Sequence, residues 1–201
     1  MRFILEFSPR QTEIIEAANH LILNDGLEGL TTKNLAKKIG ITEAALYRHF
    51  PSKLEILLAM ITYFERRAVG LLQDILSSQL NGFDKIHQIL RTRVLDFQKN
   101  PATMVVILSE EIFPNESELS RKVSELIQMN QKAITELLQS AQNENVIRKD
   151  TSAEQLFFIL LGSFRFLVTR WRLTGFQFDL VNEFEKVWSV LERMLLKEIN
   201  L

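Results

Sequence analysis

The helical spacing of its apolar residues constrains the fold of this chain more than any other feature. Between residues 54 and 75 an apolar side chain recurs every three or four positions, which places one stripe along a helix: Leu54, Leu57, Leu58, Ile61, Phe64, Ala68, Leu71, Leu72 and Ile75. The sequence has no run of alternating β-branched residues, and glycine (7) and proline (4) are scarce among its 201 residues. It therefore predicts an all-α fold.

Capping residues and helix breakers divide this pattern into about nine helices. Ser8-Pro9-Arg10-Gln11 predicts the start of the first helix, and Asn24-Asp25-Gly26 predicts its end. Thr151-Ser152-Ala153-Glu154 predicts the start of a later helix in the same way. The helices after the first are expected at these residues: 31 to 40, 43 to 50, about 25 residues from Lys53, 84 to 99, 101 to 113, 117 to 142, 152 to 173 and 179 to 198.

The composition excludes several classes of protein. The chain contains no cysteine, which excludes disulfides, cysteine-zinc sites and thiol catalysis. The first residues, M-R-F-I-L-E-F, form too short an apolar run for a signal peptide. The most apolar stretch, residues 156–168, is shorter than the roughly 20 residues that cross a bilayer. We therefore expect a soluble, cytoplasmic protein that has no cofactor and does not bind membranes.

Residues 31–50 have the spacing of a helix-turn-helix motif. Ala36 allows two helices to cross at close range, and Gly40 supplies the positive φ that the tight turn needs. Leu46 and Phe50 are expected to anchor the last helix of the motif in the core formed by the first two. The capped helix ends on both sides of the turn strengthen this prediction.

Basic residues are concentrated around this motif. Between residues 31 and 54 five residues are basic and one is acidic, although the net charge of the whole chain is −1. A small basic module is therefore expected on a slightly acidic body, which is typical of a nucleic-acid-binding domain. Lys37 and Lys38 either steer phosphates or only increase solubility.

The helix at residues 43–50 carries side chains suited to contact DNA. Its N-terminal end is expected to lie toward the bases in the major groove. Ala44 and Ala45 keep that end slim, and their methyl groups can contact thymine methyls. Donors suited to phosphate oxygens follow on the same segment: Tyr47, Arg48, His49 and Lys53.

The string T-T-K-N-L-A-K-K-I-G-I-T-E-A-A-L-Y-R-H-F-P-S-K, from Thr31 to Lys53, resembles the tetracycline-repressor (TetR) family of regulators. The likeness covers residues 8 to 60, and the rest is similar in length and helicity. It implies a homodimer that binds a palindromic operator and represses transcription until a small molecule enters the larger domain. It also implies a DNA-binding domain at 1–52, joined by the fourth helix from residue 53 to a ligand-binding and dimerisation domain at 53–201.

The resemblance also implies roles for individual residues. Five positions match those that typically contact phosphates in the family: Thr32, Thr42, Tyr47, His49 and Lys53. Five others match those that lie where bases are read: Lys33, Glu43, Ala44, Ala45 and Arg48. Glu43 departs from the pattern, and its carboxylate either reads cytosine or points to solvent. The leader before Ser8 is short and apolar, which argues against contacts from the N-terminus into the minor groove.

The helix at 152–173 is apolar nearly all round, so two sides of it must be covered. Its own domain can cover one side and a second subunit the other. Pairing this helix and the last one with their symmetry mates gives a four-helix interface. The residues predicted for it are Phe158, Leu161, Phe166, Arg170, Trp188, Leu191 and Leu195. The alternative is a monomer with a thick core.

The resemblance assigns a ligand cavity to the larger domain, and an aromatic lining with methionine suits an apolar or amphipathic ligand. The predicted lining is Phe97, Met104, Ile107, Leu108, Phe113, Met129, Phe157, Phe164 and Arg165. Apolar residues at helical spacing are more often ordinary core. Arg165 either pairs with an acid across the dimer or holds an anionic group of the ligand.

We therefore expect a ligand-responsive transcriptional regulator, a repressor in which the fourth helix couples the ligand site to the DNA-binding domain. The alternative is a helical DNA-organising or protein-interaction module of the same fold without a small-molecule ligand. An enzyme is not expected, because the three histidines lie on separate segments, without metal-ligand spacing. A glycine-rich phosphate loop is also missing from the sequence.

Overall fold

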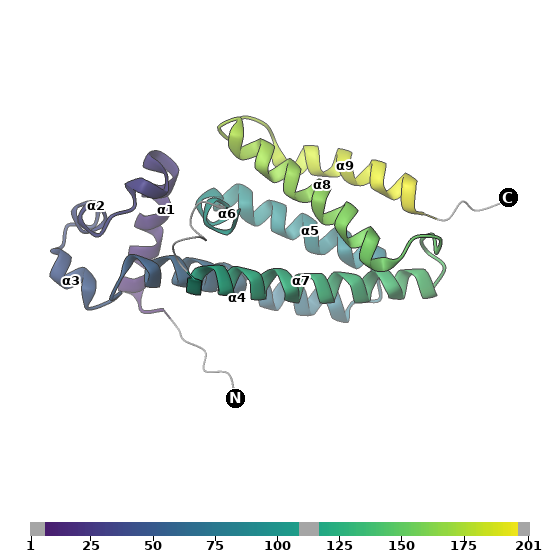
Figure 1. Ribbon diagram of the computed structural model, residues 1–201, viewed down its shortest axis with the longest axis horizontal. Coiled ribbons are helices and arrows are strands. Elements are labelled where there is room, and N and C mark those ends of the chain that lie inside the picture. Colours follow the sequence, from purple (N-terminus) through teal and green to yellow (C-terminus); the bar gives the residue numbers. More distant parts are fainter. Residues whose placement is uncertain (1–6, 109–116, 197–201) are drawn as a thin grey trace. The chain divides into compact units, whose positions relative to one another are not determined.

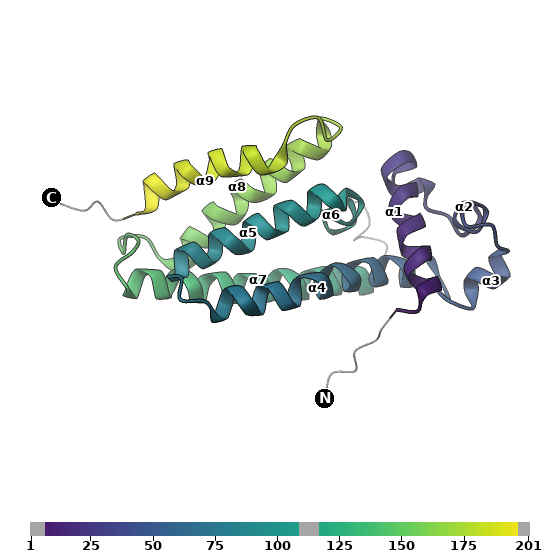
Figure 2. The same cartoon turned by 180° about the vertical axis from the view of Figure 1, so that it is seen from behind.

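The computed structural model describes residues 7–108 and 117–196, without the side chains of 67–70. Regular structure in these residues is helical, apart from one antiparallel bridge between Ile147 and Leu196 (Figure 1, Figure 2). The helices are α1 (Pro9–Gly29), α2 (Thr32–Lys38), α3 (Glu43–Tyr47), α4 (Lys53–Ser77), α5 (Gly82–Lys99), α6 (Pro101–Leu108), α7 (Ser117–Asn143), α8 (Ala153–Leu173) and α9 (Leu180–Leu195). The predicted all-α fold is confirmed for this part of the chain. The far ends of the helices predicted at 101–113 and 179–198 lie outside the described residues.

Local capping explains where α1 begins and ends. The Ser8 hydroxyl oxygen accepts from the Gln11 N–H at 3.2 Å, and the Gln11 side-chain oxygen accepts from the Ser8 N–H at 3.0 Å. Pro9 occupies the first turn, where its missing N–H costs nothing. Gly26 has a φ of 70° and interrupts the helix. The predicted capping box and helix stop are therefore confirmed, although one further helical turn follows the interruption.

The start of α8 differs from the prediction by one residue. Ser152 is the N-cap, and its capping box is closed by Gln155. The sequence had suggested a box from Thr151 to Glu154. Thr and Ser are both good caps, and Glu and Gln both close a capping box, so the local pattern does not distinguish the two registers.

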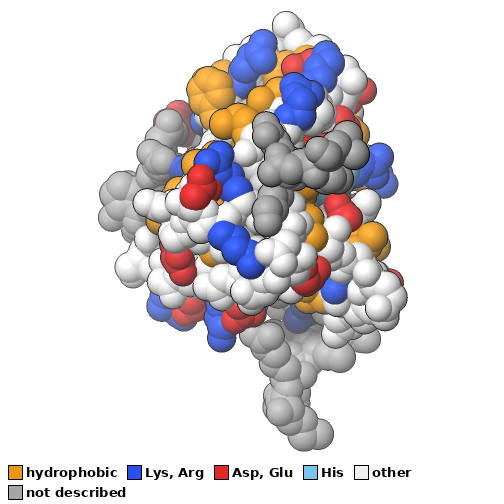
Figure 3. Space-filling model, turned by 90° about the vertical axis from the view of Figure 1, so that its right-hand side faces the viewer, with side chains coloured by type: hydrophobic (Ala, Val, Ile, Leu, Met, Phe, Trp, Pro, Cys, Tyr) orange, Lys and Arg blue, Asp and Glu red, His pale blue; other side chains and the backbone are white. Residues whose placement is uncertain are grey.

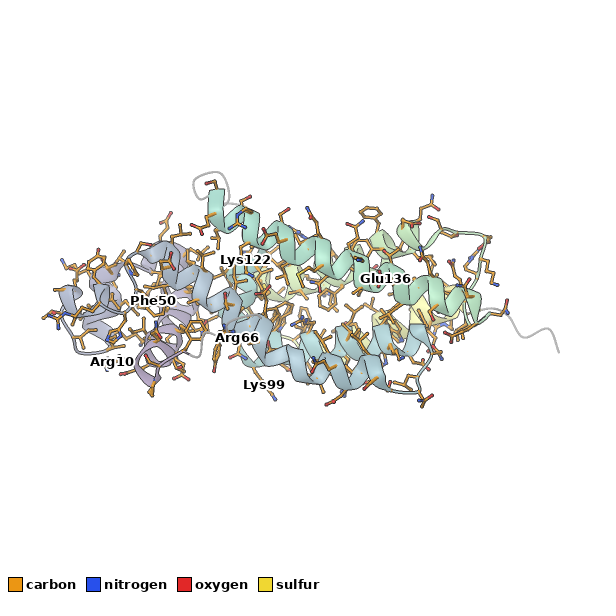
Figure 4. All side chains as sticks on the ribbon, turned by 90° about the horizontal axis from the view of Figure 1, so that it is seen from below. Arg10, Phe50, Arg66, Lys99, Lys122 and Glu136 are labelled. Atoms are coloured by element: carbon orange, nitrogen blue, oxygen red, sulfur yellow. The ribbon has the colours of Figure 1, made fainter. Side chains whose placement is uncertain are left out.

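The chain divides into two compact units, of which the first comprises Met1–Arg66 and Asn100–Lys122. Within it α1 contacts α2 and α6, and α2 contacts α3. An ion pair of 2.9 Å joins Lys122 at the start of α7 to Glu65 on α4, next to Arg66 (Figure 4). This unit includes residues beyond the predicted domain at 1–52, because α6 packs on α1.

The second unit comprises Arg67–Lys99 and Val123–Leu201, and in it α9 contacts both α5 and α8 (Figure 1, Figure 2). The ring of Trp188 on α9 stacks on Phe83 and on His87 of α5, each with a centroid distance of 4.8 Å. Glu185 adds a polar contact beside this stack, with its carboxylate 2.8 Å from His87 Nε2 and 2.8 Å from Arg91 Nε. Aromatic stacking and an ion pair therefore fix α9 on α5.

Candidate nucleic-acid interface

Two capped helices and a glycine turn build the helix-turn-helix. Thr31 caps α2 by accepting from the Asn34 N–H at 3.1 Å, and Thr42 caps α3 by accepting from the Ala45 N–H at 3.1 Å. Between the helices Gly40 has a φ of 68°, a backbone conformation that strains residues with a side chain. The two threonine caps and the glycine turn agree with the sequence prediction.

Burial separates the inner and outer faces of this motif. Ala36, Leu46 and Phe50 are buried, with Leu46 at 0% exposure. The outer face carries five of the predicted contact residues, all exposed: Lys33, Glu43, Ala44, Tyr47 and Arg48. Thr42 is also exposed, and Ala45 is half-buried. The segment that the sequence predicted to enter DNA is therefore open to solvent within its own unit.

Three predicted contact residues are linked by hydrogen bonds across α2 and α3. The Thr32 hydroxyl donates to Glu43 Oε2 at 2.7 Å, and the Tyr47 hydroxyl lies 3.5 Å from Thr32 Oγ1, at the limit of a hydrogen bond. The sequence had left Glu43 between reading cytosine and pointing to solvent. In the structure its exposed side chain is tethered to the first residue of α2, which is compatible with either role.

Two other residues predicted to contact DNA, Lys53 and His49, are hydrogen-bonded to α1. Lys53 Nζ donates to the Leu27 carbonyl oxygen at 2.9 Å, so this ammonium group satisfies a carbonyl near the end of α1. The His49 carbonyl accepts from the Gln11 side-chain amide at 3.4 Å, and the residue is half-buried. Gln11 was predicted only as a capping residue. No sequence signal connects it with a partner 38 positions away.

The predicted ligand-pocket residues are divided between the two units. Phe97 and Phe157 are buried in the second unit, where the Phe97 and Phe164 rings lie 6.3 Å apart. Met129 is 57% exposed, because the buried stripe of α7 runs through Leu126 and Ile134. Arg165 is exposed in the same unit. The others belong to the first unit, with Met104 buried and Ile107 and Leu108 half-buried, whereas Phe113 lies outside the described residues.

The predicted dimer-interface residues fall into two groups. Trp188, Leu191 and Leu195 are buried within the chain, because α5 and α8 cover the apolar stripe of α9. They are not the open surface that the sequence suggested. The α8 residues are more accessible: Phe158 is 65% and Phe166 is 71% exposed, Leu161 is half-buried, and the exposed Arg170 lies with its guanidinium 5.2 Å from the Phe178 ring centre.

The outer surface of the second unit combines apolar and basic side chains. Figure 3 looks onto the C-terminal end of α9 and shows hydrophobic groups next to Lys and Arg. The exposed large apolar residues of α8 and α9 are Phe158, Ile159, Phe166, Leu173, Val190 and Met194. As the sequence predicted, α8 has more apolar residues than one buried face can hold.

Other site types were also considered. Among residues 7–108 and 117–196, no cluster of histidine and carboxylate side chains could hold a metal ion. The described helices are also too short or too polar to cross a membrane. The candidate functional site is therefore the exposed side of α3, the helix that Thr42 caps.

A basic helix-turn-helix with an open recognition segment defines the class of protein: a DNA-binding regulator. Comparison with known families narrows this class. Residues 14–60 match bacterial regulatory proteins of the tetR family, and residues 58–193 match the C-terminal region of YsiA-like proteins. The chain belongs to the TetR family of bacterial regulators. This confirms the resemblance inferred from residues 31–53, and the chain is a regulator rather than an enzyme.

Individual relatives extend over most of the chain. The nucleoid occlusion factor SlmA of Haemophilus influenzae (strain PittGG) is 28% identical over 195 residues, which cover 91% of this chain and 84% of SlmA. The ketosteroid transcriptional regulator KstR2 of Mycobacterium tuberculosis has a TM-score of 0.77 at 19% identity, covering 98% of this chain and 100% of KstR2. FadR of Bacillus subtilis, solved in complex with stearoyl-CoA, has a TM-score of 0.75 at 17% identity, covering 90% and 96%. These two structures share the fold of this chain.

Proposed function

We propose that this regulator is cytoplasmic and binds a palindromic DNA operator as a homodimer. It represses transcription until a small apolar or amphipathic ligand releases it from the operator. One observation carries the DNA-binding part of the proposal. Leu46 anchors α3 at 0% exposure, while Ala44 and Tyr47 on the same helix point outward.

The dimensions of α3 suit the major groove. A helix with full side chains is about 10–12 Å across, and the groove is about 12 Å wide. Short side chains at Ala44 and Ala45 reduce the width of the leading end, so the backbone can come closer to the base edges. The exposed Lys33 on α2 and Arg48 at the end of α3 then supply positive charge for the flanking phosphates.

The exposed apolar residues of α8 support dimerisation. Phe158 and Phe166 lie two helical turns apart and are 65% and 71% exposed, which is costly for large aromatic side chains in a lone chain. A two-fold axis beside α8 would bury both residues against their copies. It would also provide two recognition helices, as two half-sites about 34 Å apart require.

The ligand part of the proposal rests on the apolar interior and on the relatives. The buried Phe97 and Phe157 and the half-buried Phe164 give the second unit an aromatic interior. FadR of Bacillus subtilis, which shares the fold, was solved with stearoyl-CoA. A long acyl chain is therefore the first ligand class to test. The relative named as a nucleoid occlusion factor favours the alternative, a DNA-organising module without a small-molecule ligand.

DNA binding is tested by selecting sites from a random duplex library with the full chain. We expect a symmetric consensus, and an affinity that falls linearly with salt on a log–log plot. Arg48→Ala should weaken binding and reduce the slope by about one unit for each phosphate that the guanidinium no longer neutralises. The matched control is Lys132→Ala, at an exposed position on α7 of the second unit. Binding without any sequence selection would overturn the proposal.

The ligand is tested separately on the selected site. The purified chain is titrated with stearoyl-CoA and, as a control, with free CoA, while DNA binding is followed by fluorescence anisotropy. We expect the acyl thioester to lower DNA affinity by about 5- to 150-fold, the usual range of an allosteric coupling, and free CoA to have no effect. Mass spectrometry of the purified protein identifies any small molecule that is bound to it, and this molecule is then titrated in the same way. If neither stearoyl-CoA nor that molecule changes the DNA affinity, the ligand-free alternative is favoured.

A further inference from the structure

An acidic residue stands at the front of the recognition helix. Glu43 is the first residue of α3 and is exposed, in a segment where the other charged residues are basic. A carboxylate at this place repels phosphates, so it lowers DNA affinity unless it has a favourable partner in the complex. Its position therefore needs an explanation beyond general electrostatic attraction to DNA.

The structure shows how this carboxylate is held. The Thr32 hydroxyl donates to Glu43 Oε2 at 2.7 Å, which ties the tip of the side chain to the start of α2. An exposed glutamate otherwise samples several rotamers, and holding it in place costs entropy. The hydrogen bond supplies this order before DNA arrives, and it leaves Oε1 available as an acceptor.

The same hydrogen bond changes the expected role of Thr32. A hydroxyl has one proton to donate, and Thr32 gives it to Glu43, so it cannot donate to a phosphate at the same time. The Tyr47 hydroxyl lies 3.5 Å from Thr32 Oγ1 and can donate to it. The chain of donors therefore ends on the carboxylate instead of on DNA.

We infer that Glu43 reads a cytosine in each half-site, and that Thr32 is a positioning residue that orients its carboxylate. This inference rests on the proposed binding of α3 in the major groove. An ionised carboxylate only accepts hydrogen bonds, and cytosine presents the N4 amino donor there without an adjacent acceptor. Adenine presents the N7 acceptor next to its N6 donor, so a carboxylate there meets repulsion as well as attraction. Guanine and thymine present only hydrogen-bond acceptors, and these repel a carboxylate.

Three variants of the full chain, compared with the wild type, test this inference through base preference. In a random-library selection the wild type should enrich cytosine at one position of each half-site, by on the order of tenfold over other bases. Glu43→Gln should lose that preference or shift it to adenine, which an amide can bind through N6 and N7. Thr32→Val removes the hydroxyl and should weaken the cytosine preference, whereas Thr32→Ser keeps the hydroxyl and should retain it.

A matched control separates base reading from the loss of one negative charge. Glu136→Gln, at an exposed position on α7, should leave the selected sequence unchanged (Figure 4). Circular dichroism establishes that each variant is folded. If Glu43→Gln raises affinity for all sequences equally and keeps cytosine, the carboxylate is only a repulsive charge and the inference is wrong.

The remaining outcomes are distinct from one another. If Thr32→Val selects cytosine as strongly as the wild type, Thr32 has no positioning role. If the wild type selects a clear site without a cytosine preference, Glu43 does not read this base, while the proposed function stands. A wild type that binds every duplex equally overturns the proposed function and this inference with it.

Discussion

Replacing Gly82 with alanine should destabilise the second unit, because the first residue of α5 lies directly against the backbone of α7. A Cβ atom placed on Gly82 would meet the Leu137 carbonyl oxygen at 2.1 Å and the Ala141 nitrogen at 3.0 Å. A carbon atom normally approaches a carbonyl oxygen to about 3.3 Å. The start of α5 must therefore move by about 1 Å, because a carbonyl within a helix cannot turn aside as a flexible side chain does.

The size of the effect follows from this geometry. Overpacking typically costs about 1–3 kcal/mol, and the upper end applies because the obstacle is backbone. The shift also disturbs the cap of α5, in which Asn81 Oδ1 accepts from the Asp84 N–H at 2.9 Å. The better helix propensity of alanine offsets less than about 1 kcal/mol at a helix start. We expect a net loss of about 3 kcal/mol, or a melting temperature lower by about 6–12 °C for a chain of this size.

Tryptophan fluorescence during urea unfolding is the appropriate assay. Both tryptophans of the chain, Trp171 and Trp188, lie in the second unit, and Trp188 stacks on the residue next to Gly82. The control is Lys132→Ala, at an exposed position on α7 of the same unit. This variant should be as stable as the wild type to within about 0.5 kcal/mol, as is usual for surface substitutions. If Gly82→Ala unfolds at the same urea concentration as the wild type, α5 and α7 are not packed as closely as the structure indicates.

Three further predictions concern the turns and one exposed ion pair. Gly40→Ala adds only backbone strain, because the φ of Gly40 is 68° and a Cβ there meets nothing within 4 Å. The substitution should lower the free energy of unfolding, followed by circular dichroism, by about 1–2 kcal/mol, and it should weaken DNA binding. Thr42→Ala removes the cap of α3 and should cost about 1 kcal/mol, with a loss of DNA affinity that Thr42→Ser restores. The hydrogen bond and charge of Arg148 lower the pKa of the exposed Asp150 carboxyl, so an NMR titration should place its midpoint below the usual 3.9 or so. Arg148→Ala should raise that midpoint. Because the folded-state pKa is depressed, the pair stabilises the fold at neutral pH, and this contribution is lost as the pH falls through the folded-state pKa.

Much of the fold was predictable because its determinants are local. The caps at Ser8 and Thr42 depend on residues three positions away, and a glycine at position 40 by itself indicates a positive φ. The periodicity of apolar residues depends on neighbours three and four positions apart. The sequence therefore predicted the helices, the glycine turn and the outward-facing end of α3. The uncertain register at the start of α8 arose where two local patterns were equally good.

The sequence predicted less well which partner a side chain meets. The apolar stripe of α9 was visible, and Trp188 was assigned to a dimer interface, but α5 of the same chain covers it. Lys53 was predicted to contact a phosphate, and the structure shows that its ammonium group also donates to the Leu27 carbonyl, a bond that the sequence did not predict. In both cases periodicity and charge indicate the kind of partner that a side chain requires, an apolar surface or a hydrogen-bond acceptor. The actual partner lies far away along the chain.

The sequence alone thus determined the helices, the helix-turn-helix and the family to which the chain belongs. Only the tertiary structure decided that Thr32 holds Glu43, that α6 joins the first unit, and that α9 is buried on α5. The physical reason is the range of the interactions. Hydrogen bonds and steric limits between neighbouring residues act within a few positions, whereas packing joins segments whose proximity is set by the folded chain as a whole.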